Sequence, residues 1–161
     1  MRWSDLVHEQ PDLAHAARDR FDVHRHKLLA TLRADGAPRI SGVETTFDDE
    51  LWLGMMPDSR KGEDLRRDPR LALHSGSPDP DDANPTAWLG DAKLTGRAVA
   101  IDDEASRRRY VDLQSRMPPG PFDLFRVDVE SLTVIRIGDP PDHLVIETWR
   151  GGHGLRRIER R

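Results

Sequence analysis

The stretch that most constrains the fold of this chain is Leu51–Ser75, which reads LWLGMMPDSRKGEDLRRDPRLALHS. It begins with a short apolar strand, Leu51–Met55, and after a proline-containing break Ser59 has the chemistry of a helix N-cap. The helix must stop at Asp68-Pro69, because the residue before a proline is pushed out of the α region. Arg70–Ser75 then reads as another strand. The pattern predicts strand, short helix and strand within 25 residues.

The first turn of this helix carries two cations, Arg60 and Lys61. Cations at that end oppose the helix dipole, and the backbone N–H groups of a first turn have no partner within the helix. Both features suit a bound anion, because the free N–H groups point toward it. The sequence therefore predicts a phosphate seat at Ser59, Arg60 and Lys61, with an ordinary solvated helix start as the alternative.

Tight turns and alternating apolar residues predict mostly antiparallel strands along the rest of the chain. We expect a mainly β protein with about eight strands and three flanking helices, closed into a barrel because closure removes exposed strand edges. The predicted strands are Lys27–Leu32, Arg39–Phe47, Leu51–Met55, Arg70–Ser75, Ala87–Ile101, Phe122–Val129, Leu132–Ile137 and His143–Trp149. The predicted helices begin at Pro11, at Ser59 and at Asp102 or Asp103, and the last of them reaches about Met117.

Length and charge restrict the class of protein. The 161 residues suffice for one domain, residues 1–161, with a helical segment over 1–23 and a basic tail over 150–161. The net charge of -4 provides no field for nucleic acid, and the absence of cysteine excludes disulfides and thiolate metal sites. No apolar run approaches the roughly 20 residues of a membrane span, and the first residues lack a secretory apolar core, so we expect a cytoplasmic protein. A hydrophobic fraction of 36% is lean for a monomer and favours a dimer.

The order of these motifs resembles the pyridoxamine 5′-phosphate oxidase-like family, the FMN-binding split barrels. The matching parts are the hairpin LATLRADGAPRISGV, the triplet Ser59-Arg60-Lys61 after a strand, the Asp68-Pro69-Arg70 stop, and GDAKLTGRAV. The resemblance runs from about His24 to Ile101. It implies an antiparallel, homodimeric split barrel with FMN, or in one branch the deazaflavin coenzyme F-420, bound at the dimer interface.

The same resemblance assigns a cofactor-binding role to three segments and one isolated residue. Arg60 and Lys61 would hold the cofactor phosphate with Ser59 beside them. The segment Arg39–Glu44 would run along the flavin, and Gly54 and Met55 would approach it by backbone. The residues concerned are Arg39, Ile40, Ser41, Gly42, Val43, Glu44, Gly54, Met55, Ser59, Arg60, Lys61 and Asp91.

Two departures from the family bear on the substrate. The vitamin B6 oxidases carry a lysine where this chain has Glu44, and that lysine grips the substrate phosphate. At about 4 Å and an effective dielectric near 20, attraction and repulsion of one charge pair differ by several kcal/mol. The oxidases also have a tyrosine-threonine pair where this chain has Gly54-Met55. We therefore expect a small-molecule substrate other than pyridoxine 5′-phosphate.

Three functional hypotheses remain open from the sequence. The first is a flavin- or deazaflavin-dependent oxidoreductase, for which no catalytic side chain is assigned because the flavin carries the redox chemistry. The second is a non-enzymatic barrel that holds a flavin or a haem, with a histidine as the haem ligand. The third is an interaction protein that uses its basic tail, although the acidic remainder of the chain argues against nucleic acid. No metal site is assigned, because His24 and His26 lack an evident third ligand.

Overall fold

The fold is mainly β, as the sequence predicts, and the computed structural model describes residues 1–115 and 120–161. Within these residues it contains four α-helices, one short 3₁₀ helix and eight strands. The helices are α1 Trp3–Glu9, α2 Pro11–Val23, α3 Arg60–Arg67 and α4 Glu104–Asp112, and the 3₁₀ helix η1 is Pro85–Ala87. The strands are β1 Lys27–Leu32, β2 Pro38–Phe47, β3 Leu51–Met55, β4 Arg70–His74, β5 Asp91–Ala100, β6 Asp123–Ile137, β7 Leu144–Arg150 and β8 Gly154–Arg160.

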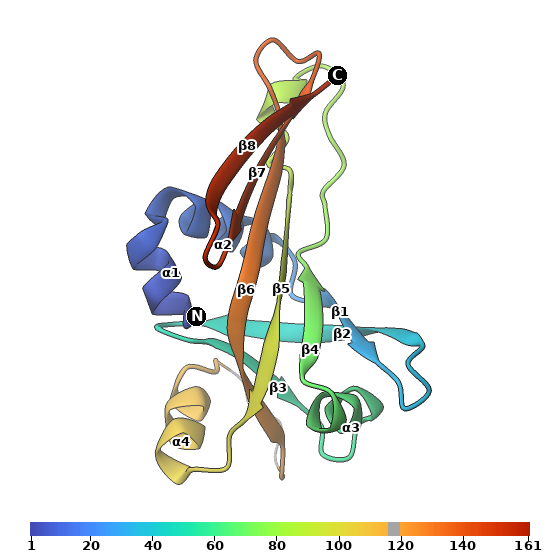
Figure 1. Ribbon diagram of the computed structural model, residues 1–161, viewed down its shortest axis with the longest axis vertical. Helices are drawn as coiled ribbons and strands as arrows, with labels where there is room; N and C mark the ends of the chain where they lie inside the picture. The colour runs from blue at the N-terminus through green and yellow to red at the C-terminus, as the bar shows by residue number, and fades with distance from the viewer. Residues whose placement is uncertain (116–119) are drawn as a thin grey trace.

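Six of the strands close into a barrel. The sheet order is β3-β2-β1-β4-β5-β6-β7-β8, and a further pairing between β3 and β6 closes the ring of the first six strands. All the pairings are antiparallel. The strands β7 and β8 extend the sheet beyond the barrel, and Figure 1 shows them rising with the upper part of β6 as an arm above it.

One pair of helices covers one side of the arm, and the other two helices cover separate regions of the barrel. In Figure 1, α1 and α2 lie together beside the arm, whereas α3 and α4 lie at the opposite end of the barrel. The core between the N-terminal helices and the sheet contains the buried rings of Trp3 and Phe21, and both rings pack against Phe47 of β2. Trp149 of β7 is also buried there and donates a hydrogen bond from Nε1 to Glu9 Oε1 at 2.8 Å.

The strand Asp123–Ile137 corrects one prediction, because β6 is continuous where the sequence suggested two strands. Its pairing with β5 shifts between Thr95 and Gly96, so that Glu130 is an extra residue in a β-bulge rather than part of a turn. Gly96 permits this arrangement, because a Cβ at that position would lie 2.4 Å from the carbonyl oxygen of Asp128.

The C-terminal segment corrects a second prediction. His143–Trp149 is not the last strand, because residues 154–160 form β8 and pair with β7 along their whole length. The charged sequence GLRRIER obscures this strand, since only Leu155 and Ile158 supply the apolar residues that mark a strand face. Trp149 is 1% exposed, so its ring is not available to cover a flavin.

The remaining differences concern element ends. β5 begins at Asp91 rather than Ala87, because residues 85–87 form η1. Trp88 packs in the loop before β5, where its Nε1 donates to Pro78 O. The helix predicted to reach Met117 ends at Asp112, and Met117 lies outside the described residues. Among the helices of residues 1–115 and 120–161, none has the length and apolar character needed to cross a membrane.

The barrel interior should determine the stability of the fold. Leu29 of β1 is fully buried, so Leu29→Ala should lower the free energy of unfolding by about 2–5 kcal/mol. Leu155→Ala is the control, because this β8 side chain is 47% exposed and its truncation should change stability by about 0.5 kcal/mol or less. Urea denaturation measures both. Equal losses in the two variants would contradict the assignment of Leu29 to the core.

Candidate functional site

The start of α3 has the capped geometry that the sequence predicts. Ser59 has extended backbone angles, and its Oγ accepts a hydrogen bond from the Gly62 N–H at 3.3 Å. The cap satisfies one of the free donors of the first turn and leaves the N–H groups of Arg60 and Lys61 without an intrahelical acceptor. The helix therefore presents backbone donors and two cationic side chains at the same end.

The two cations differ in their surroundings. The Arg60 side chain is 77% exposed and contacts Glu63 at 3.1 Å one turn along the helix. Lys61 instead lies along β2, where its Nζ donates to the carbonyl oxygen of Gly42 at 2.5 Å. Partial burial lowers the pKa of the Lys61 ammonium from its usual value. The contact between Lys61 and Gly42 brings together two of the segments that the sequence assigned to one site.

The strand β2 presents alternate residues to opposite sides, as predicted. Ile40, Gly42 and Glu44 are exposed on the outer side of the barrel, and Ile40 is 72% exposed. Arg39, Ser41 and Val43 are more buried, and Val43 belongs to the hydrophobic core. Because its side chain is in the core, Val43 can reach a ligand outside the barrel only through its backbone.

Arg39 points toward α3 rather than along the outer face. Its Nε donates to Oδ2 of the buried Asp64 at 2.7 Å. The same oxygen accepts from Thr31 Oγ1 at 2.8 Å, and Arg67 Nη2 donates to the other oxygen at 3.1 Å. Burial alone would raise the pKa of Asp64, but hydrogen bonds from Arg39, Thr31 and Arg67 outweigh it and lower the pKa.

Glu44 is held by two basic side chains from the segment between α2 and β1. Its Oε1 accepts a hydrogen bond from Arg25 Nε at 3.0 Å and lies 3.6 Å from His26 Nε2. All three side chains are about half exposed or more. The Glu44 carboxylate is thus paired rather than free, and Arg25 joins it at the surface.

The pair Gly54-Met55 is less open than expected. Tyr110 of α4 covers the outer side of β3, and a Cβ at Gly54 would lie 2.0 Å from the Tyr110 hydroxyl oxygen. Burial raises the pKa of Tyr110 above its usual value. Met55 faces the barrel core and is 7% exposed. These two residues line the barrel wall beside α3, with Tyr110 packed against its outer surface.

Asp91 lies apart from the other candidate residues. It begins β5, and β1 and β4 separate that strand from β2 in the sheet order. Asp91 Oδ1 is buried and lies 3.8 Å from Nε2 of His74 on β4. The structure therefore brings together the candidates of β2, β3 and α3, whereas Asp91 belongs to a different part of the sheet.

Several contacts at this corner were not anticipated from the sequence. The sequence analysis singled out neither Asp64 nor Tyr110, which fall in the helices predicted to begin at Ser59 and at Asp102 or Asp103. The arginines that follow on α3 are paired within the protein: Arg66 contacts Asp123 at 2.6 Å, and Arg67 donates to Leu32 O as well as to Asp64. No local sequence pattern marks these contacts, because they join segments that lie far apart in the chain.

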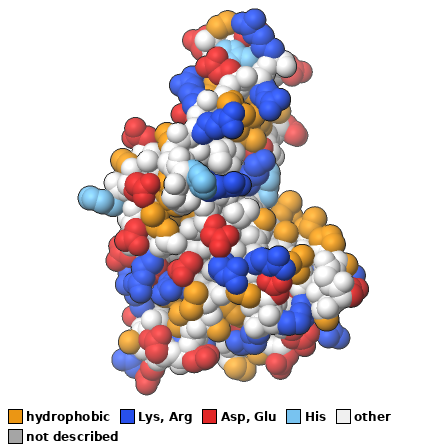
Figure 2. Space-filling view, viewed as in Figure 1, with side chains coloured by type: hydrophobic (Ala, Val, Ile, Leu, Met, Phe, Trp, Pro, Cys, Tyr) orange, Lys and Arg blue, Asp and Glu red, His pale blue; other side chains and the backbone are white. Residues whose placement is uncertain are grey.

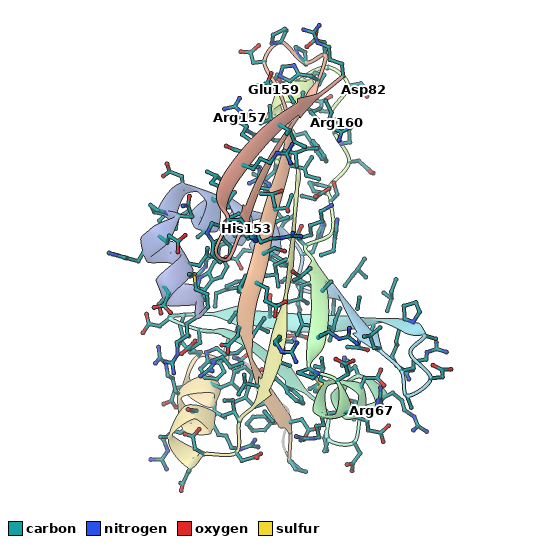
Figure 3. All side chains as sticks on the ribbon, in the orientation of Figure 1. Arg67, Asp82, His153, Arg157, Glu159 and Arg160 are labelled. Atoms are coloured by element: carbon teal, nitrogen blue, oxygen red, sulfur yellow. The ribbon has the colours of Figure 1, made fainter. Side chains whose placement is uncertain are left out.

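Three surface hollows lie elsewhere on the molecule. One of about 640 Å³ runs along α4, a second of about 480 Å³ lies between α1 and the turn at Asp48-Asp49, and a third of about 420 Å³ adjoins the turn between β7 and β8. Residues 1–115 and 120–161 hold no group of three histidine, aspartate or glutamate side chains arranged for a metal ion. Figure 3 shows the chain's side chains, including Arg67 on α3 and the charged residues of β8.

A closed antiparallel barrel extended by an extra hairpin, with a short capped helix beside it, defines the split-barrel class. The sequence matches the pyridoxamine 5′-phosphate oxidase family over residues 13–136, and the chain belongs to that family. Among curated protein sequences, none matches this chain.

Solved structures share the fold at low sequence identity. An FMN-binding protein related to pyridoxamine 5′-phosphate oxidase, from Nostoc punctiforme PCC 73102, is 14% identical with a TM-score of 0.62, covering 94% of this chain and 96% of its own. PhzG from Burkholderia lata 383, in complex with tetrahydrophenazine-1-carboxylic acid, is 15% identical with a TM-score of 0.59, covering 96% and 91%. General Stress Protein 26 from Bacillus anthracis str. Sterne is 14% identical with a TM-score of 0.56, covering 74% and 91%.

The contact between Gly54 and Tyr110 leads to a prediction about stability. Gly54→Ala should displace Tyr110 and lower the free energy of unfolding by about 1–3 kcal/mol, the usual cost of overpacking. Gly42→Ala is the matched control, because nothing lies within 4 Å of a Cβ at that position. Thermal or urea denaturation of the cofactor-free protein compares them. A Gly54→Ala variant as stable as Gly42→Ala would show that α4 does not pack as described.

Proposed function

We propose that this chain is an oxidoreductase that uses FMN, or alternatively coenzyme F-420, and holds the cofactor phosphate at the start of α3. The observation that carries the proposal is the capped helix start, where the first turn leaves the N–H groups of Arg60 and Lys61 free and also carries both cationic side chains. The membership in the pyridoxamine 5′-phosphate oxidase family supports the cofactor class.

The residues at this corner fit a phosphate group. Arg39, Arg60 and Lys61 contribute three positive charges, against which Glu63 and Asp64 contribute two negative ones. Ser59 adds a hydroxyl, and the helix dipole favours an anion at this end. Lys61 at present donates to a neutral carbonyl, Gly42 O, so turning toward a phosphate would exchange this contact for a charge-assisted one.

The ring of the cofactor would lie along the outer side of β2. Ile40 offers an exposed apolar surface there, and the absence of a side chain at Gly42 leaves the backbone open. When bound, a flavin supplies hydride transfer through its own ring. The chain would bind and orient it: Ile40 contacts the ring, Gly42 allows close approach, and Ser41 contributes a polar group on the adjacent backbone.

The surroundings of Glu44 guide the choice of substrate. A carboxylate in that position repels a phosphate, and the contacts with Arg25 and His26 hold the Glu44 side chain in place. The proposed substrate is therefore a small molecule other than pyridoxine 5′-phosphate, transferring hydride to or from the cofactor.

A second copy of the chain would complete the site. The outer side of β1 and β2 exposes Leu28 and Ile40, at 50% and 72%, and Met56, in the segment between β3 and α3, is 79% exposed. Figure 2 shows hydrophobic side chains gathered on the surface of the barrel below the arm. Apolar surface of this kind is typical of an interface between subunits, and a homodimer would cover it together with the start of α3.

The direct test is a titration of the purified protein with FMN, coenzyme F-420 and haem. The proposal predicts that FMN or F-420 binds more tightly than haem. Preferential binding of haem would instead favour a non-enzymatic haem-binding barrel, and failure to bind either flavin would contradict the proposal. The cofactor that binds can then be tested for reduction and reoxidation on the protein.

Lys61→Ala should weaken binding of the phosphate-bearing cofactor by about 1.5–3 kcal/mol, because the variant loses a charge-assisted hydrogen bond. Fluorescence titration measures the affinity. Arg108→Ala on the exposed surface of α4 is the control for loss of one positive charge and should leave the affinity unchanged. An unaltered affinity in the Lys61 variant would remove this residue from the site.

Leu28→Glu should shift the protein toward monomers, because it places a charge in the proposed apolar interface. Analytical ultracentrifugation over a range of concentrations measures the shift. The control is Leu155→Glu, which introduces the same charge in place of a leucine at a 47% exposed position of β8, in the arm beyond the barrel. A wild-type protein that stays monomeric, or a dimer unaffected by Leu28→Glu, would exclude this face as the interface.

A further inference from the structure

Asp64 is a buried carboxylate that collects three donors from three different elements. Its side chain is 4% exposed, and it lies on the side of α3 that faces the barrel. Oδ2 accepts from Thr31 of β1 and from Arg39 of β2, and Oδ1 accepts from Arg67 of α3 itself. The carboxylate thus connects α3, the helix with the candidate phosphate-binding site, to the two strands β1 and β2.

The geometry of Arg39 leaves part of its guanidinium available. The contact with Asp64 uses Nε, and within the described part of the chain the two Nη groups have no hydrogen-bond partner. The side chain is 25% exposed, so the group is neither sealed in the core nor free in solvent. A guanidinium fixed through Nε still has its planar pair of terminal donors, which suit two oxygens of a phosphate.

We infer that Asp64 is a positioning residue, which holds Arg39 so that its terminal nitrogens face the phosphate of the cofactor bound at the start of α3. This inference rests on the proposed function and adds to it a residue that touches neither cofactor nor substrate. Asp64 also accepts a hydrogen bond from Arg67, which donates in addition to the carbonyl oxygen of Leu32 at the end of β1.

The negative charge of Asp64 and its role in holding Arg39 have opposite effects on the affinity for phosphate, which makes the inference testable. Asp64 is negative, so its field opposes a nearby phosphate, and neutralising it would by charge alone tighten phosphate binding. If Asp64 instead acts by holding Arg39, neutralising it weakens phosphate binding, because the guanidinium then loses its fixed orientation. A purely structural role would affect all ligands of the site alike.

The experiment compares FMN with riboflavin, which carries the same ring and ribityl chain but no phosphate. The quantity measured is the ratio of the two dissociation constants in wild-type protein and in Asp64→Asn. The positioning role predicts that FMN affinity falls by about tenfold, as for supporting partners of metal ligands, while riboflavin affinity stays unchanged. Circular dichroism and thermal unfolding of each variant confirm that the ratio is measured on folded protein.

Two further variants act as controls. Asp68→Asn removes the same charge at the end of the same helix, where the carboxylate pairs with Arg70 on the surface, and it should leave the ratio unchanged. Arg39→Gln should lower the preference for FMN by itself, and adding Asp64→Asn to it should lower that preference no further. If Asp64→Asn does not fold, Asp64→Glu keeps the charge but displaces the carboxylate, and the same loss of preference is expected.

The outcomes separate the inference from the function on which it rests. A wild-type protein that binds neither FMN nor F-420 contradicts the proposed function. A wild-type protein that prefers FMN to riboflavin, with an equal or greater preference in Asp64→Asn, leaves the function standing and overturns the positioning role. Parallel losses of FMN and riboflavin binding would also overturn it, because they indicate a structural effect alone.

Discussion

The fixed placement of α3 against the barrel depends on one buried carboxylate. Asp64 lies beneath the helix and accepts hydrogen bonds from Thr31, Arg39 and Arg67, so α3 is bound to β1 and β2 by charged contacts rather than by apolar packing alone. Leu65 is the fully buried apolar side chain of this eight-residue helix. Removing one partner of a buried charge pair typically costs about 3–5 kcal/mol. The orientation of the helix start, with its free N–H groups, follows from this attachment.

The barrel provides a rigid frame for that helix. The strand β3 pairs with β2 on one side and β6 on the other, and α3 follows β3 after four residues. The closure of the barrel therefore determines where the helix begins, and Lys61 comes to lie along Gly42 of β2. Sequence segments that are almost twenty residues apart meet in this way at one corner of the barrel, where the chain carries an excess of positive charge.

The local features of this corner could be predicted from the sequence. Ser59 is a helix cap because its side chain can accept from the backbone of the first turn, and Asp68-Pro69 ends the helix for steric reasons. The alternation of Ile40, Gly42 and Glu44 on one face of β2 follows from strand geometry alone. These predictions depend on residues close together in the chain, and the strand-rich order with few helices already favoured a barrel.

The contacts that were missed depend on residues far apart in the chain. Tyr110 covers Gly54, and Asp64 selects Arg39 and Thr31 among many possible partners, neither of which any local pattern indicates. β8 was missed because its arginines conceal an edge strand, although charged residues are common at such edges. The bulge at Glu130, which falls between two predicted strands, was missed for a related reason, since a bulge depends on the register with the neighbouring strand.

The central claim is that the start of α3 binds the phosphate of a flavin-type cofactor. A crystal structure of the protein with bound FMN tests it most directly. The account predicts phosphate oxygens within hydrogen-bonding distance of Lys61 Nζ and of the backbone N–H groups of Arg60 and Lys61. A bound FMN whose phosphate lies at another place, with the start of α3 still open to solvent, would contradict the account.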